Sequence, residues 1–261
     1  MAQFTVDLSR FASIARGSSL HELITHEALT LALEGEVAVK WAPFDHTPST
    51  ARLSIVGITP GQEQSSNALK AFRAALLEGK SDVDALRHAK LVGSFSGPMR
   101  SNIVKMLDSI GLQWKFNLPT CAALFDADHE RVHFTSALRY PVFVNGANYN
   151  GTPDLLRTPL LRDMAETFLA EEVRALPGAL WLPLGPKPTA ALRHLVARGV
   201  LPADRLLEGM PHPSGANAER IKFFLGQKRR SDLSVKTRPD LIETARTALL
   251  AQVAGLQPQE A

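Results

Sequence analysis

The sequence predicts an α/β protein, a three-layer α/β/α sandwich around a central, mainly parallel four-stranded sheet. After residue 50, short apolar runs that contain β-branched residues alternate with helical patterns, and this alternation is typical of a parallel sheet covered on both faces. The chain has 261 residues, of which 45% are hydrophobic and 21% charged. It is therefore long enough to bury a substantial core.

The first 50 residues predict a helical cap on this domain. Helices are expected over residues 7–15 and 20–33, the second because its apolar side chains recur at helical spacing. We assign 51–230 to the α/β domain. The last segment, 231–261, is expected to contribute a helix over 239–253 that packs on the same domain.

Four apolar segments predict the strands of the central sheet. They cover residues 52–58, 132–137, 179–184 and 205–208, with a further short strand expected at 122–125. Amphipathic patterns predict helices at 67–77, 83–91, 100–110, 160–176 and 189–198.

The composition excludes several classes of protein. A single cysteine, Cys121, excludes an internal disulfide and any multi-cysteine metal or iron–sulfur site. Residues 1–17 include Asp7, Arg10 and Arg16, so they lack the uninterrupted apolar run of a signal peptide or membrane span. We expect a cytoplasmic monomer that uses no metal or cofactor and binds no membrane.

One loop carries the strongest local signal. His212 lies between Pro211 and Pro213, and proline fixes its own backbone angle and disfavours helix in the residue before it. Ser214 or Asn217 would then cap a helix that continues through residue 225. The imidazole is therefore expected near a helix N-terminus, where a developing negative charge would be stabilised.

A basic run follows this loop. Residues 220–238 contain seven Lys or Arg against one acidic residue, although the net charge of the whole chain is only +3. A solvated helix face explains such a run in most proteins, but beside the histidine it also fits a phosphate backbone. The predicted DNA contacts are Ser214, Gly215, Asn217, Arg220, Lys222, Lys228, Arg229 and Arg230.

Four segments that follow strands or turns together resemble the uracil-DNA glycosylase superfamily, over roughly residues 52–225. They are Gly57-Ile58-Thr59-Pro60-Gly61, Phe95-Ser96-Gly97, Thr135-Ser136-Ala137-Leu138 and His212-Pro213-Ser214-Gly215. None is specific alone, but their order and spacing fit the family. The segments at Thr59, Ser136, Gly185 and His212 all follow predicted strands, and ligands of parallel sheets bind at the carboxyl ends of strands.

The resemblance implies hydrolysis of the N-glycosidic bond of a nucleotide flipped out of double-stranded DNA. In this interpretation His212 donates to the pyrimidine O2, Phe95 stacks on the base from an exposed turn, and Gly57 and Ile58 help to bind it. A histidine that only braces its loop, a rim phenylalanine and simple turn glycines remain the alternatives for these residues taken singly.

Two positions depart from the family pattern. Thr59 stands where many members carry Asn, Asp or Glu to position the water, and a hydroxyl is no general base at neutral pH. Glu63 is the nearest carboxylate and the second candidate for this role. Ser136 replaces an Asn that reads uracil, so the pocket would admit a larger base. Tyr149, in a Gly-rich run, would stack on sugar or base, or else lie on the surface.

We therefore expect a monofunctional DNA glycosylase that removes a modified cytosine, such as the hydroxymethylated or glucosylated base of some phage genomes, in antiviral defence. The alternatives are a uracil-excision repair glycosylase, a non-catalytic DNA-binding module on the same scaffold, and a nucleoside hydrolase. The bulky wedge that many members carry after the histidine motif is absent, because Ala216 and Asn217 are small. Either Arg220 or another loop would take its place.

Overall fold

The chain folds into two compact units that are built from alternating stretches of sequence. In the computed structural model, which describes residues 4–258, the first unit contains the stretch up to Thr47, Ile58–Ser94 and Phe134–Ala175. The second contains Pro48–Gly57, Phe95–His133 and the stretch from Leu176 onward. The division into 1–50, 51–230 and 231–261 stays a prediction.

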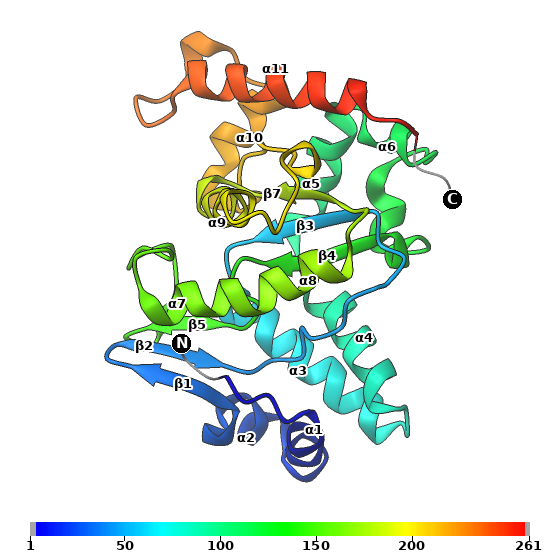
Figure 1. Ribbon diagram of the computed structural model, residues 1–261, viewed down its shortest axis with the longest axis vertical. Coiled ribbons are helices and arrows are strands. Elements are labelled where there is room, and N and C mark those ends of the chain that lie inside the picture. Colours follow the sequence, from blue (N-terminus) through cyan, green and yellow to red (C-terminus); the bar gives the residue numbers. More distant parts are fainter. Residues whose placement is uncertain (1–3, 259–261) are drawn as a thin grey trace. The chain divides into compact units, whose positions relative to one another are not determined.

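The helices of the first unit begin at the residues that the sequence marks as caps. They are α1 (Leu8–Gly17), α2 (Leu20–Thr25), α3 (Gln62–Leu77), α4 (Asp82–Gly93), α7 (Pro159–Met164) and α8 (Ala170–Ala175) (Figure 1). A π-helical turn, Ala165–Leu169, joins the last two. Ser19 and Glu22 form a capping box at α2. Helices α3 and α4 pack closely because Gly93 has no side chain, since a Cβ there would lie 2.7 Å from that of Ala68.

An antiparallel sheet completes the first unit. Its strands are β1 (Thr30–Glu34), β2 (Val37–Lys40), β5 (Val142–Val144) and β6 (Ala147–Asn148), in that order. The predicted helix over 20–33 is therefore wrong beyond Thr25. His26 turns extended there, with its Nδ1 accepting from Ala28 N, and pairing with β2 satisfies the backbone that follows.

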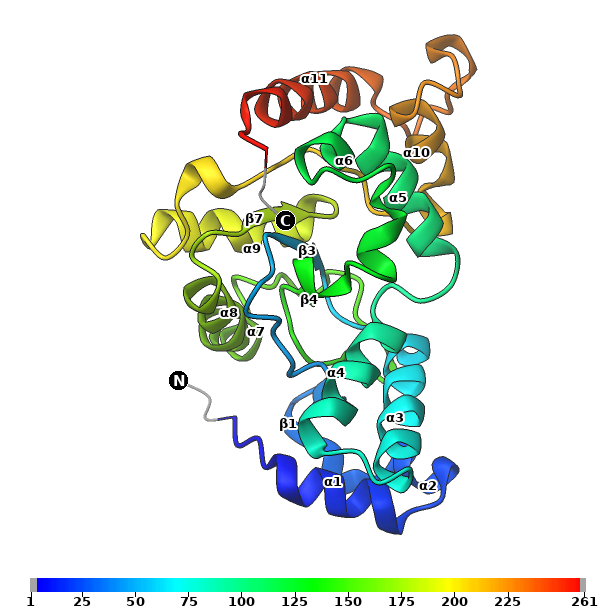
Figure 2. The same cartoon turned by 90° about the vertical axis from the view of Figure 1, so that its right-hand side faces the viewer.

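The second unit is built around parallel strands. Strand β3 (Leu53–Gly57) pairs in parallel with β7 (Leu180–Pro183), and the sheet order is β4-β3-β7, where β4 (Val132–Ser136) begins in this unit. Its helices are α5 (Pro98–Ser109), α6 (Leu112–Lys115), α9 (Pro186–Ala197), α10 (Ala218–Phe224) and α11 (Pro239–Gly255) (Figures 1 and 2). The α/β class is thus confirmed.

The predicted fourth strand at 205–208 is wrong as a strand. Only two isolated parallel bridges form there, Trp181 with Leu206 and Leu184 with Met210. Gly209, at φ +119°, interrupts the extended backbone between the bridges. The central sheet therefore has three strands, and the segment after Leu206 follows its edge without a continuous ladder.

The short strand predicted at 122–125 is also wrong, because these residues form a 3₁₀ turn, Cys121–Phe125. Asp108 accepts from Cys121 N at 2.8 Å and from Thr120 Oγ1 at 2.6 Å. Thr120 in turn caps the turn through Ala122 N. These side-chain acceptors compete with a strand ladder for the backbone.

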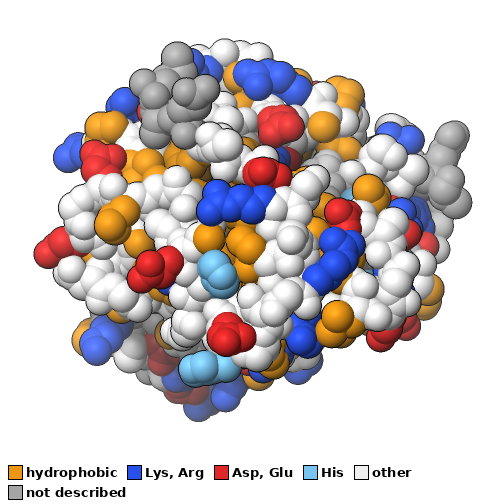
Figure 3. Space-filling view, turned by 90° about the horizontal axis from the view of Figure 1, so that it is seen from below, with side chains coloured by type: hydrophobic (Ala, Val, Ile, Leu, Met, Phe, Trp, Pro, Cys, Tyr) orange, Lys and Arg blue, Asp and Glu red, His pale blue; other side chains and the backbone are white. Residues whose placement is uncertain are grey.

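The surface shown in Figure 3 carries Lys and Arg side chains interspersed with Asp and Glu, in keeping with the small net charge. Among the described residues, no helix has both the length and the apolar character needed to cross a bilayer.

Candidate functional site

The histidine loop is anchored at the carboxyl end of the parallel sheet. Gly185, directly after β7, donates its N–H to Met210 O at 2.9 Å. Gly185 adopts φ +89°, and a Cβ on it would lie 3.3 Å from the Cβ of His212. Asn102 of α5 fixes the other side by donating to Pro213 O at 2.8 Å. The sequence-predicted position of His212, beside the end of a parallel strand, is therefore what the second unit shows.

The ring of His212 is held in one protonation state. Its Nδ1 lies 3.2 Å from Ser214 N and accepts that N–H, so the ring proton of the neutral imidazole resides on Nε2. Burial lowers the pKa of His212 below its usual 6.5. His212 is thus a neutral hydrogen-bond donor at physiological pH.

Neither predicted cap acts through its side chain on the helix after the histidine. A 3₁₀ turn, Gly215–Asn217, precedes α10, and Asn217 stands at the cap position of α10 without a side-chain bond to it. Instead Asn217 Nδ2 donates to Ser214 Oγ at 3.2 Å, and Arg220 Nη1 donates to Asn217 Oδ1 at 2.5 Å. The amide joins the histidine loop to α10 side chains.

The basic run is partly neutralised by acids that its own sequence window does not contain. Lys228 pairs with Glu219 at 2.7 Å. Arg230 pairs with Asp240 and Glu243 of α11, whereas Arg229 pairs with Asp232 at 3.0 Å. By contrast, Lys222 is exposed and has no ion pair with a described residue.

In the first unit, the turn after β3 is tied to the segment that leads into β5. Thr59 Oγ1 donates to Tyr140 O at 2.9 Å and accepts from Val142 N at 3.1 Å. Ile58 O accepts from Leu138 N at 3.0 Å, next to buried Gly57. The proton of the Thr59 hydroxyl is therefore already used, which leaves one lone pair for another donor.

The remainder of this turn rests on β6. Asn148 Oδ1 accepts from Gln62 N at 2.9 Å, and Gly61 packs against the same amide. Glu63 lies exposed in the first turn of α3. Sequence reasoning noticed Asn148 only as part of a Gly-rich loop, since nothing in the chain links it to Gln62.

Ser136 ends β4 and is 8% exposed. Its neighbour Thr135 donates to Glu172 Oε2 at 2.7 Å, and Arg139 Nε donates to Glu172 Oε1 at 2.7 Å. A buried ion pair therefore stiffens the segment around Ser136. Glu172 and Arg139 carried no sequence signal, because only the fold brings α8 to this strand.

The two aromatic candidates are less exposed than the sequence suggests. Phe95 is 5% exposed and adopts φ +48°, so the expectation of an exposed turn aromatic is wrong. Tyr149 is 4% exposed, and its hydroxyl donates to Pro153 O at 2.6 Å. Burial raises the pKa of Tyr149 to about 12, with Asp154 adding to the effect. Tyr149 is thus no surface tyrosine, and its hydroxyl already has an acceptor.

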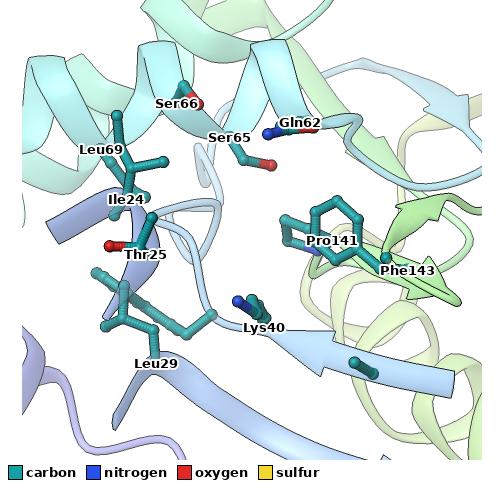
Figure 4. A pocket seen from close by; sticks show the side chains of 13 residues that line it. Ile24, Thr25, Leu29, Lys40, Gln62, Ser65, Ser66, Leu69, Pro141 and Phe143 are labelled. Carbon is teal, nitrogen blue, oxygen red and sulfur yellow. The ribbon is translucent and has the colours of Figure 1, made fainter. Parts of the chain in front are cut away.

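A cavity of about 250 Å³ lies within the first unit beside this turn. Figure 4 shows Ser65 and Gln62 of α3 on one side and Lys40 of β2 on the other, with Pro141 between them. Pro141 separates Tyr140 from Val142, the two residues bonded to Thr59. Its mixed lining could hold a small group with apolar and polar parts.

No family model matches the chain, and no solved structure matches it. The chain is 32% identical over 227 residues to a Bacillus subtilis (strain 168) protein named "Uncharacterized protein YoxB". The aligned region covers 86% of this chain and 88% of that protein. The chain therefore belongs to the same family as YoxB.

Proposed function

We propose that the protein is a monofunctional DNA glycosylase that hydrolyses the N-glycosidic bond of a flipped-out pyrimidine and leaves an abasic site. The observation that carries the proposal is the neutral His212, whose Nδ1 accepts from Ser214 N and whose Nε2 is left as the donor. The finer expectations, a three-layer sandwich and a cytoplasmic location, belong to the same proposal.

The chemistry requires a donor for the departing base. As the glycosidic bond breaks, the sugar becomes cation-like and negative charge gathers on the base oxygen. A donor fixed in advance stabilises that charge by about 3 to 4 kcal/mol in the transition state. His212 is fixed in this sense by Ser214 N and by the close approach of Gly185.

The attacking water needs less help. Thr59 Oγ1 has one lone pair left, which can orient a water but takes up its proton poorly. A sugar cation that forms before attack lowers the need for a base. We propose that Thr59 shapes the turn and orients water, and that Glu63 takes the proton.

The substrate we propose is a modified cytosine. Serine at position 136 is shorter than an amide side chain, so more room is left beside the base. The physiological role that follows is removal of modified phage bases in antiviral defence. Uracil excision in repair is the competing substrate assignment.

The test compares three duplexes that carry uracil, hydroxymethylcytosine or glucosylated hydroxymethylcytosine, each followed by alkaline cleavage of abasic sites. We expect cleavage of modified-cytosine DNA, and a rate that falls roughly 10²- to 10³-fold in His212→Ala. Cleavage of the uracil duplex alone would reject the modified base, and an unchanged rate in His212→Ala would reject the donor role.

A non-catalytic DNA-binding module is the second candidate, and the occupied hydroxyl of Thr59 favours it. It predicts salt-sensitive duplex binding that His212→Ala leaves intact, with no base released from any duplex. A nucleoside hydrolase would instead be indifferent to charge reversal at Lys228, Arg229 and Arg230.

A further inference from the structure

The loop between α10 and α11, residues 226–238, has a shape fixed by one carboxylate. Glu219 accepts from Lys228 Nζ at 2.7 Å, from Ser234 N at 3.1 Å and from Ser234 Oγ at 2.6 Å, and also from Thr237 Oγ1. These bonds hold the pKa of Glu219 well below its usual range. Figure 2 shows this loop, in orange, projecting beyond α10 and α11.

An apolar side chain stands at the tip of this loop. Val235 is completely exposed, at 101%, between the two anchored residues Ser234 and Thr237. Its β-branched side chain has few rotamers. Lys236 and Arg238, exposed on the same loop, form no ion pair with any residue that the structure describes. A rigid apolar tip with unpaired cations beside it suits a polyanion with an apolar interior.

A chain of hydrogen bonds links the loop to the imidazole. Arg220 Nη2 donates to Lys236 O at 3.3 Å and its Nη1 donates to Asn217 Oδ1. Asn217 donates to Ser214 Oγ, and Ser214 N donates to His212. Arg220 is thus occupied on both branches of its guanidinium. It braces the loop and is a poor candidate for the missing wedge.

We propose that residues 226–238 form a DNA-probing loop in which Val235 enters the base stack beside the nucleotide that is flipped. Lys236 and Arg238 would contact phosphates, which fixes the register of the loop on the duplex. Apolar side chains that enter a base step offset the cost of unstacking it. Glu219 and Arg220 are positioning residues. The inference rests on the proposed glycosylase function, because only base removal requires the duplex to be opened.

The test uses the full chain and a duplex with 2-aminopurine next to the target base, since the fluorescence of that base rises on unstacking. We compare Val235→Ser and Val235→Leu with Val83→Ser, which alters a valine that is 61% exposed in α4. The fluorescence rise should fall by about fivefold or more in Val235→Ser. It should persist in Val235→Leu and in the control.

Positioning by Glu219 has its own readout. Glu219→Ala should lower base opening in duplex DNA while the excision rate from single-stranded DNA stays unchanged, because a single strand needs no wedge. Glu219→Gln, which keeps an acceptor for Ser234 N, should restore part of the effect. Equal losses on both substrates would mean that Glu219 only stabilises the fold, and would reject its role as a positioning residue.

The outcomes separate the two proposals. Base opening that depends on Val235 without release from any DNA supports the loop and rejects the glycosylase. Release from duplex DNA at the same rate in Val235→Ser and in the unaltered protein rejects the loop alone. A protein that neither binds nor opens the duplex rejects both.

Discussion

At the scale of single residues, His212 shows how a backbone amide can select a tautomer. Ser214 N points at Nδ1, so a proton on that nitrogen would face another donor. The ring consequently resists protonation, in the same direction as its burial. The same contact that prepares a donor for the substrate makes the folded chain sensitive to acid.

We predict that His212 contributes an acid-dependent loss of stability. Above pH 6.5 the ring is neutral in the folded and unfolded chains alike, so its titration changes nothing. Below pH 6.5 the unfolded chain binds a proton before the folded chain does, and the free energy of unfolding falls with pH until the lower folded pKa is passed.

Urea denaturation between pH 7.5 and pH 5 checks this prediction. The other histidines titrate as well, so the informative quantity is the difference between the unaltered chain and His212→Gln, which keeps a polar side chain without a titration. An identical pH dependence in the two proteins would contradict the prediction.

A second prediction concerns the buried ion pair behind Ser136. Arg139 is 8% and Glu172 1% exposed, so Glu172→Ala would leave a buried cation without its main partner. We expect a loss of about 3 to 5 kcal/mol in the free energy of unfolding. Glu171→Ala is the control, because Glu171 is 66% exposed and lies 3.4 Å from the same guanidinium; its loss should stay below about 1 kcal/mol. Both follow from chemical denaturation.

At the scale of elements, the bend before the histidine loop depends on a residue without a side chain. Gly209 adopts φ +119°, and a Cβ there would lie 2.8 Å from the carbonyl oxygen of Ala245 in α11. Gly199 also has a positive φ, of +69°, but nothing lies within 4 Å of its Cβ position. The two glycines separate backbone strain from steric exclusion.

We predict that Gly209→Ala displaces α11 and destabilises the chain by roughly 2 to 4 kcal/mol, whereas Gly199→Ala costs about 1 kcal/mol from strain alone. Thermal unfolding followed by circular dichroism measures both. Equal effects would show that α11 moves aside without cost.

Elements with strong local signals could be predicted from the sequence, and those decided by distant partners could not. The helices near 83–91 and 239–253 and the strand near 179–184 are confirmed within a few residues. The apolar residues near Leu31 suit a helix and a strand equally, and pairing with β2 decided between them. The position of His212 follows from its prolines, whereas the role of Glu219 depends on Ser234 and Thr237, which no local pattern connects to it.

At the scale of the whole molecule, charge pairing rather than charge number should govern DNA binding. We predict that Lys236→Ala with Arg238→Ala lowers the slope of log affinity against log salt concentration by about 2. Arg230→Ala is the matched control, since its cation is already paired with Asp240 and Glu243, and it should leave the slope nearly unchanged. Fluorescence anisotropy with a labelled duplex at several salt concentrations measures the slope, and equal slopes would contradict the prediction.

The alternation of the chain between its two units also limits how the gene can be divided. Because each unit gathers three separate stretches, no single internal truncation yields either one whole. Two polypeptides split at the boundary after Ala175 would each carry incomplete parts of both, and would regain structure only when expressed together. Fragment complementation in a cell is therefore a direct selection for variants that still fold.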